Sequence, residues 1–190
     1  MNKKTLIPQH GGYRNLHSFK TAQIVYDSTV IFCNRFVSRF SRTQDQMVQA
    51  ARSGVQNIAE GSVASATSKK TELKLTNVAK ASLEELLLDY EDYLRQRGLK
   101  QWKTESPQAV FIRQIRFSDM SDLSDTSEPY CLTTTRDEVA ANVLICLINQ
   151  ACFLLRKQLQ KLEREFLEEG GFTERLYKVR SAQKQRNGFR

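Results

Sequence analysis

Hydrophobic and small residues recur at intervals of three and four along most of this chain, which is the spacing of amphipathic helices. A first row predicts a helix from Phe19 to Phe40. Its members are Phe19, Ala22, Tyr26, Thr29, Cys33, Phe36 and Phe40. A second row predicts a helix from Thr43, where Thr43 and Gln46 have capping-box spacing, to about Ala64. This row has an unusually slim face, made of Met47, Ala50, Ala51, Gly54, Ile58 and Gly61.

Two longer rows follow in the second half of the chain. The third predicted helix runs from about Lys69 to Arg97, with Gly98 as its stop. Its face carries Leu75, Ala79, Ser82, Leu86, Tyr90 and Tyr93. The fourth begins at Thr135, which has capping-box spacing to Glu138, and continues to Gly170 and Gly171. Its apolar positions are Val139, Val143, Leu147, Ala151, Leu154, Leu162 and Phe166.

Residues 99–133 interrupt the helical pattern. Ser106 and Pro107 predict the start of a short helix that runs to Arg116, because proline favours the first position of a helix. A serine-rich loop follows, with acidic residues at Asp119, Asp122, Asp125 and Glu128. No segment alternates with period two, so the predicted class is all-α: an antiparallel up-down-up-down four-helix bundle with an insertion between helices three and four. The expected domain limits are a flexible basic segment at 1–18, the bundle at 19–171 and a basic tail at 172–190.

Charge is concentrated at the two ends. The chain carries 29 Lys and Arg against 21 Asp and Glu, a net charge of +8. Four of the bases lie in residues 1–20, without an acid, and six lie in residues 172–190 against Glu174 alone. The remaining 19 bases and 20 acids leave the body nearly neutral. Since antiparallel helices return the chain to its starting end, both basic ends should emerge together, opposite the acidic insertion.

Several classes of protein are disfavoured by the composition. The four cysteines form no CxxC pair and fit reduced core positions. Residues 1–20 lack the apolar run of a secretory signal, and the stretch from Val139 to Leu155 is interrupted by Asn142, Asn149 and Gln150. A buried core helix explains that stretch better than a membrane span. We therefore expect a cytoplasmic protein without a membrane partner.

Catalytic and metal sites find little support. A di-metal bundle needs Glu-x-x-His pairs on its helices, but the two histidines, His10 and His17, precede the first predicted helix. Helical-bundle ribonucleases place Arg and His late in the bundle, whereas Arg14 and His17 lie early and at the wrong spacing. No P-loop or nucleophile elbow is present. The sequence predicts no enzyme, no cofactor and no metal, and a hidden nuclease dependent on His17 is the remaining enzymatic alternative.

One motif stands out within the second predicted helix. Residues 50–61 read AARSGVQNIAEG, and Ala79, Ser82, Leu83, Glu85 and Leu86 follow in the third helix as A-x-x-S-L-x-E-L. This pattern resembles the four-helix-bundle family that includes proteins encoded in intervening sequences of bacterial 23S ribosomal RNA genes and accessory proteins of diversity-generating retroelements. The motif covers about residues 19–97, and the insertion and the basic extension make the four-helix-bundle suffix branch the closer fit.

The resemblance implies a bacterial bundle that forms a ring-like homopentamer without catalytic activity. It also implies, from the retroelement member, binding to nucleic acid and to a reverse transcriptase. That member has a basic body, whereas the body here is neutral. The corresponding motif and assembly residues are Ser53, Gly54, Asn57, Glu60, Gly61, Ser82 and Glu85.

The motif also has a physical interpretation. Gly54 and Gly61 share one helical face, where small residues let another helix approach closely. We expect Asn57 to bond the third helix near Ser82 or an orphan carbonyl, and Glu60 to pair with Arg52 or with an arginine of a neighbouring subunit. Such polar groups can fix register and oligomer state. The alternative is that Asn57 and Glu60 simply face water.

The sequence thus predicts a non-enzymatic oligomeric scaffold that binds nucleic acid, or a nucleic-acid-processing partner such as a mobile-element enzyme. The rival is an adaptor that binds only proteins. The residues expected to contact phosphate are Lys3, Lys4, Arg175, Lys178, Arg180, Lys184, Arg186 and Arg190. A solubilising tail that touches nothing is the alternative for the carboxy-terminal bases.

Overall fold

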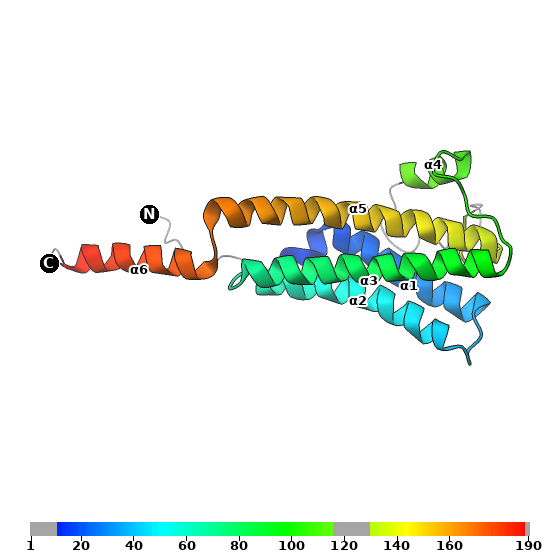
Figure 1. The fold of residues 1–190 in the computed structure, drawn as a ribbon, viewed down its shortest axis with the longest axis horizontal. Helices are drawn as coiled ribbons and strands as arrows, with labels where there is room; N and C mark the ends of the chain where they lie inside the picture. The colour runs from blue at the N-terminus through cyan, green and yellow to red at the C-terminus, as the bar shows by residue number, and fades with distance from the viewer. Residues whose placement is uncertain (1–10, 116–129, 189–190) are drawn as a thin grey trace.

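The computed structural model describes residues 11–115 and 130–188, and over these ranges the protein is helical without a β-strand (Figure 1). The predicted all-α class is therefore confirmed. The elements follow in the order η1 (Gly12–Asn15), α1 (His17–Phe36), α2 (Arg42–Ala64), α3 (Lys69–Gln96), α4 (Pro107–Gln114), α5 (Asp137–Glu169) and α6 (Phe172–Gly188).

The four longest helices, α1, α2, α3 and α5, pack together and are called the helical body below. Within it, α2 contacts α1 and α3, and α5 contacts the same two helices. Figure 1 shows α6 projecting beyond one end of the body, with α4 beside the opposite end. Gly11 lies at the α6 end, where its backbone N–H donates to the Ser62 carbonyl at 3.3 Å. Gly11 and the start of α6 thus lie at the same end of the body, as predicted.

Both predicted capping boxes are wrong by a residue or two. The N-cap of α2 is Ser41, whose hydroxyl accepts from the Thr43 backbone N–H at 3.2 Å. Thr43 is already helical and therefore cannot serve as the cap. At α5 the N-cap is Arg136, which makes no side-chain cap bond, and the Asp137 carboxylate accepts from the neighbouring Glu138 N–H at 2.8 Å. The start of α4 follows the prediction, with Ser106 as cap and proline in its first turn.

Helix ends at glycine agree with the sequence pattern, but the end of α1 does not. Gly98 and Gly170 adopt φ values of 66° and 75°, a conformation that favours glycine, and they follow α3 and α5. Helix α1 ends at Phe36 because Val37 is extended. Phe40 lies beyond the helix and is fully exposed, so its predicted place in the core row is wrong.

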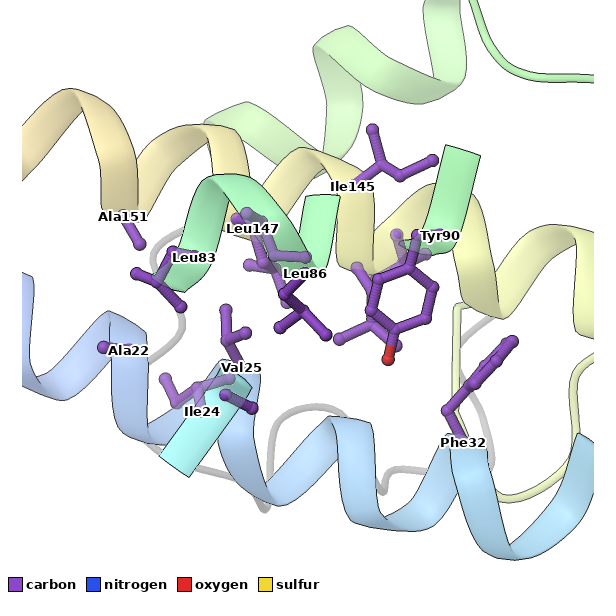
Figure 2. Close-up of a cluster of buried hydrophobic side chains, with 14 of the residues drawn as sticks. Ala22, Ile24, Val25, Phe32, Leu83, Leu86, Tyr90, Ile145, Leu147 and Ala151 are labelled. Atoms are coloured by element: carbon purple, nitrogen blue, oxygen red, sulfur yellow. The ribbon is translucent and has the colours of Figure 1, made fainter. Parts of the chain in front are cut away.

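All four helices of the body contribute to the core, and Figure 2 shows the part of it where α1, α3 and α5 meet. The Phe32 ring packs edge-on against Tyr90 and Tyr93, with both centroid separations at 4.9 Å. The fully buried Tyr90 hydroxyl donates to Thr29 Oγ1 at 3.1 Å, so its polar tip is satisfied. Further out along the same interfaces lie Ala22, Val25, Leu83, Leu86, Leu147 and Ala151.

A buried asparagine attaches the connection after α3 to α5. Asn142 is 1% exposed, and its Oδ1 accepts from the Trp102 N–H at 2.7 Å. Its Nδ2 donates to the carbonyls of Lys100 and Glu138, at 2.9 and 2.8 Å. Asn142, which interrupts the apolar stretch in the sequence, therefore holds the connection after α3 against α5. The acidic residues Asp119, Asp122, Asp125 and Glu128 lie outside the described residues.

The two basic ends are partly folded. In the amino-terminal segment, η1 precedes α1, and the Tyr13 ring packs edge-on to Phe19 at 4.8 Å between centroids. Residues 172–188, treated above as a basic tail, form helix α6 after the glycine pair at 170 and 171. Gly171 begins this turn by donating its N–H to the Glu174 carboxylate at 2.6 Å. The carboxy-terminal bases are therefore carried on a helix.

Candidate assembly surface and nucleic-acid interface

The two motif glycines bring α2 and α3 into close contact. A Cβ atom at position 54 would lie 2.8 Å from Leu83 Cδ2 and 2.9 Å from Leu83 Cγ. At position 61 it would lie 3.4 Å from the Glu72 carbonyl oxygen and 3.4 Å from Leu75 Cβ. The first pair of distances is shorter than carbon atoms tolerate, so a Cβ at position 54 would force the Leu83 side chain to shift. The prediction of a close helix approach is confirmed, and the partner is α3 of the same chain.

A short polar chain joins the same two helices beside the glycines. The hydroxyls of Ser53 and Ser82 hydrogen-bond to each other at 2.9 Å. Asn57 Nδ2 donates to the Ser53 carbonyl at 2.9 Å and to Ser53 Oγ at 3.1 Å. Asn57 therefore reaches Ser82 only through Ser53, and its predicted direct bond to the third helix is replaced by one within its own helix.

Glu60 and Glu85 stand at the outer edge of this contact, and both are exposed. Ser53, Asn57 and Glu60 recur along one side of α2, and Ser82 and Glu85 along one side of α3. We call these five residues the outer seam. The predicted pair of Glu60 with Arg52 does not form: both side chains are exposed, and they lie eight residues apart, beyond helical neighbour spacing. Within the described ranges, neither outer-seam glutamate has an ion-pair partner.

Apolar and acidic side chains flank the outer seam on α3. Val78 is 37% exposed and Leu88 is 63% exposed, four residues before Ser82 and three after Glu85. Burial, and then repulsion from Glu85 and Asp92, raises the pKa of Asp89 above its ordinary 3.8. The face thus combines exposed apolar groups with the carboxylates of Glu60, Glu85 and Asp89, which suits a protein partner better than a polyanion.

Helix α6 carries the opposite charge. Lys178, Arg180 and Lys184 are exposed, and none of them is ion-paired to a side chain that the structure describes. Tyr177 and Val179 on the same helix are also exposed, at 73% and 50%. The backbone positions of Arg175 and Arg186 lie in α6 as well, whereas Lys3, Lys4 and Arg190 lie outside the described residues. The five bases of residues 175–186 therefore all lie on the projecting helix α6.

A cavity of about 500 Å³ opens at the body end from which α6 projects. On its wall, Lys69 Nζ lies 3.3 Å from Glu72 Oε2 and 3.2 Å from Glu165 Oε2. Burial raises the pKa of Glu72 above 4.5 despite the attraction of Lys69. Burial works to lower the pKa of Lys69, but the two carboxylates outweigh it and raise that pKa. The single Lys69 ammonium thus neutralises only part of the negative charge of Glu72 and Glu165.

No catalytic constellation appears in the part of the chain that the structure covers. His17 is exposed at the start of α1 and lines the end cavity. No group of three His, Cys, Asp or Glu side chains among the described residues could hold a metal ion. Burial raises the pKa of the Cys33 thiol to about 12 and that of Cys152 to about 11, so both favour the unreactive thiol form.

Among the described residues one helix, α5 with its continuation to Glu174, is long and apolar enough to cross a membrane by length and composition alone. Of its most apolar window, 61% is buried inside the protein. A core helix of this kind passes the same test, and the burial of Leu144, Leu147, Ile148 and Leu155 accounts for the apolar run.

Searches with the whole chain matched no protein-family model, no curated protein and no solved structure.

Proposed function

We propose that the protein is a non-enzymatic homo-oligomeric scaffold that binds nucleic acid through α6. In this proposal the helical body is an up-down-up-down four-helix bundle of the family suggested by the motif in residues 50–61, with 99–133 as its insertion. Family membership further implies a pentamer, a cytoplasmic location and a mobile-element enzyme as a candidate partner. The sequence resemblance and the surfaces described above are its support.

The observation that carries nucleic-acid binding is the exposed basic helix that projects from the body. Lys178, Arg180 and Lys184 are held in water without acidic partners in the described chain. Such side chains can bind phosphates and release the condensed counterions, which makes the affinity fall steeply with salt. Because α6 stands clear of the helical body in Figure 1, a strand can reach several of its sides.

The outer seam is the proposed contact between copies. The hydroxyl pair of Ser53 and Ser82 fixes the spacing of α2 and α3, and the glutamates beside it have no ion-pair partner in the described part of their own chain. An arginine of a neighbouring copy could satisfy Glu60 or Glu85, while Val78 and Leu88 add apolar area at the edge. A second candidate function, a protein-only adaptor, is favoured by this acidic face because it repels phosphate.

Salt-dependent binding separates the two functions. The triple variant Lys178→Gln/Arg180→Gln/Lys184→Gln removes three bases from α6, and Arg42→Gln/Arg52→Gln/Lys74→Gln removes three exposed bases from the helical body as a matched control. For a fluorescein-labelled oligothymidylate, loss of three phosphate contacts should reduce the log–log salt slope by about 2. The control should keep the parent slope. Equal curves for all three proteins, or no binding by the parent at low salt, would favour the adaptor.

The assembly part has its own test. Glu85→Arg reverses a charge on the outer seam, and Glu105→Arg reverses an exposed charge near α4 as a control. We expect the first substitution to lower the mass measured by light scattering and the second to leave it unchanged. Unchanged mass for both variants of an oligomeric parent would place the contact elsewhere.

A further inference from the structure

The outer face of α5 carries an exposed aromatic ring among positive charges. Phe153 is 52% exposed, although α5 otherwise supplies much of the core. Lys157 lies one turn further along the helix, and its ammonium is 5.7 Å from the centroid of the Phe153 ring. Arg164 follows on the same side, because residues 153, 157, 160 and 164 recur at helical spacing. From Phe153 to Arg164 this face is roughly 16 Å long at about 1.5 Å per residue.

This half of α5 is open, unlike the preceding half. Helix α4 packs on α5 and lies over its amino-terminal part in Figure 1. The positive charge of Arg113 on α4 is close enough to Cys146 to act on that thiol's pKa, although burial dominates and raises it. Beyond that point Figure 1 shows no helix over the outer side of α5. The exposed face leads directly toward the joint with α6.

This face carries three bases, and two exposed acids, Glu163 and Glu168, lie beside them at helical spacing. Arg156, Lys157 and Arg164 are exposed, and none forms an ion pair with a side chain that the structure describes. The neighbouring Lys161 differs, because it lies 3.7 Å from Glu165 Oε1. The outer seam with Asp89 thus presents acids, whereas on the outer face of α5 three unpaired bases stand beside the exposed Phe153 ring, against the two exposed acids Glu163 and Glu168.

We infer that the face formed by Phe153, Arg156, Lys157 and Arg164 binds single-stranded nucleic acid as a continuation of α6. The inference rests on the proposed nucleic-acid function and adds residues outside both basic ends. The three bases follow the phosphate backbone, and Phe153 offers a ring on which an unpaired base stacks. Every base has a π-face, so such stacking tolerates any sequence, and a paired base inside a duplex cannot use it.

The test uses the full-length chain and two pairs of variants. Arg156→Gln/Lys157→Gln/Arg164→Gln is compared with the control Arg42→Gln/Arg52→Gln/Lys74→Gln, which removes the same charge from the helical body. Phe153→Ala is compared with Phe111→Ala, a half-exposed phenylalanine on α4 at the other end of the protein. Circular dichroism first establishes that each variant is folded. The probes are an oligothymidylate and a duplex of equal length, each labelled with fluorescein.

We expect the α5 triple variant to lower the salt slope for the single strand by about 2, and its control to leave the slope unchanged. Phe153→Ala should weaken single-strand binding by roughly 5- to 150-fold, the range of one lost base–aromatic stack. It should leave duplex binding unchanged, and Phe111→Ala should change neither.

The outcomes separate the two proposals. If the α6 variant loses affinity while both α5 variants bind as the parent does, α6 is the whole interface and the inference about α5 is wrong. Equal weakening of single strand and duplex by Phe153→Ala would refute stacking. If the parent binds neither probe at low salt, both proposals fail.

Discussion

Replacing Gly54 by alanine tests the close contact between α2 and α3 with the smallest possible perturbation. The added Cβ would lie 2.8 Å from Leu83 Cδ2, and Leu83 is fully buried, so its side chain cannot turn into solvent. Overpacking of this kind costs about 1–3 kcal/mol. Alanine is favoured over glycine in a helix by about 1 kcal/mol, which offsets part of the cost. We therefore expect a net loss of roughly 0–2 kcal/mol in the free energy of unfolding.

A double-mutant cycle with Leu83→Ala tests whether this loss of stability comes from crowding against Leu83. That substitution alone leaves a cavity and should cost about 2–5 kcal/mol. In the double variant the new methyl group occupies part of the space that Leu83 vacates. The combined loss should therefore fall short of the sum by about 0.5–3 kcal/mol, the usual coupling between contacting residues.

Urea unfolding followed by circular dichroism measures all four proteins. Gly12→Ala serves as a control, because a Cβ there meets no atom within 4 Å, and its stability should stay near that of the parent. If Gly54→Ala is more stable than the parent by the full helix-propensity gain of about 1 kcal/mol, and the cycle is additive, the described crowding does not exist. The larger Gly54→Leu should unfold the chain instead of simply dissociating an oligomer, because the crowded neighbour belongs to the same chain.

Two further predictions concern buried polar groups. Asn142→Ala should lower the unfolding free energy by about 1–3 kcal/mol, because the Trp102 N–H and the Lys100 carbonyl lose their partner. An unchanged urea midpoint would show that water replaces the lost hydrogen bonds. Burial raises the pKa of Glu72 in the folded state, so ionisation of this carboxyl opposes folding. The protonated carboxyl therefore favours the folded state at low pH, and this stabilisation is lost as the pH rises from 4.5 through the raised pKa. Glu72→Gln should therefore weaken the fall in melting temperature over that window, and an unaltered pH profile would contradict the burial of its charge.

The helical rows were predictable because burial follows period 3.6 along each helix. All six slim-face residues of α2, from Met47 to Gly61, are buried as the spacing indicates. The ends were less predictable, because local hydrogen bonds decide them. Thr43 and Thr135 have good capping-box spacing, yet Ser41 caps α2, and the N-cap residue of α5 is Arg136, which makes no side-chain cap bond. Phe40 fits the periodicity of α1, but the extended conformation of Val37 ends the helix first.

The candidate site was predictable in its buried part and not in its polar contacts. Small residues at positions 54 and 61 signal close packing whatever the partner helix is. The direction of the Asn57 amide depends on its rotamer and on the nearby Ser53 carbonyl, which spacing alone does not specify. The α5 face was missed for a different reason. Net charge counted along the chain averages Arg156 and Lys157 with the acids of the body, so it does not show which exposed bases lie beside the Phe153 ring.

The central claim is that copies of this chain assemble and hold nucleic acid, and light scattering of the purified full-length protein with absorbance detection tests it most directly. The proposal predicts a mass several times that of the 21.9 kDa chain, five times for the family's pentamer. It further predicts absorbance at nucleic-acid wavelengths that disappears on nuclease treatment or at high salt while the protein assembly persists. A single species at the mass of one chain, free of nucleic acid before any treatment, would contradict the account.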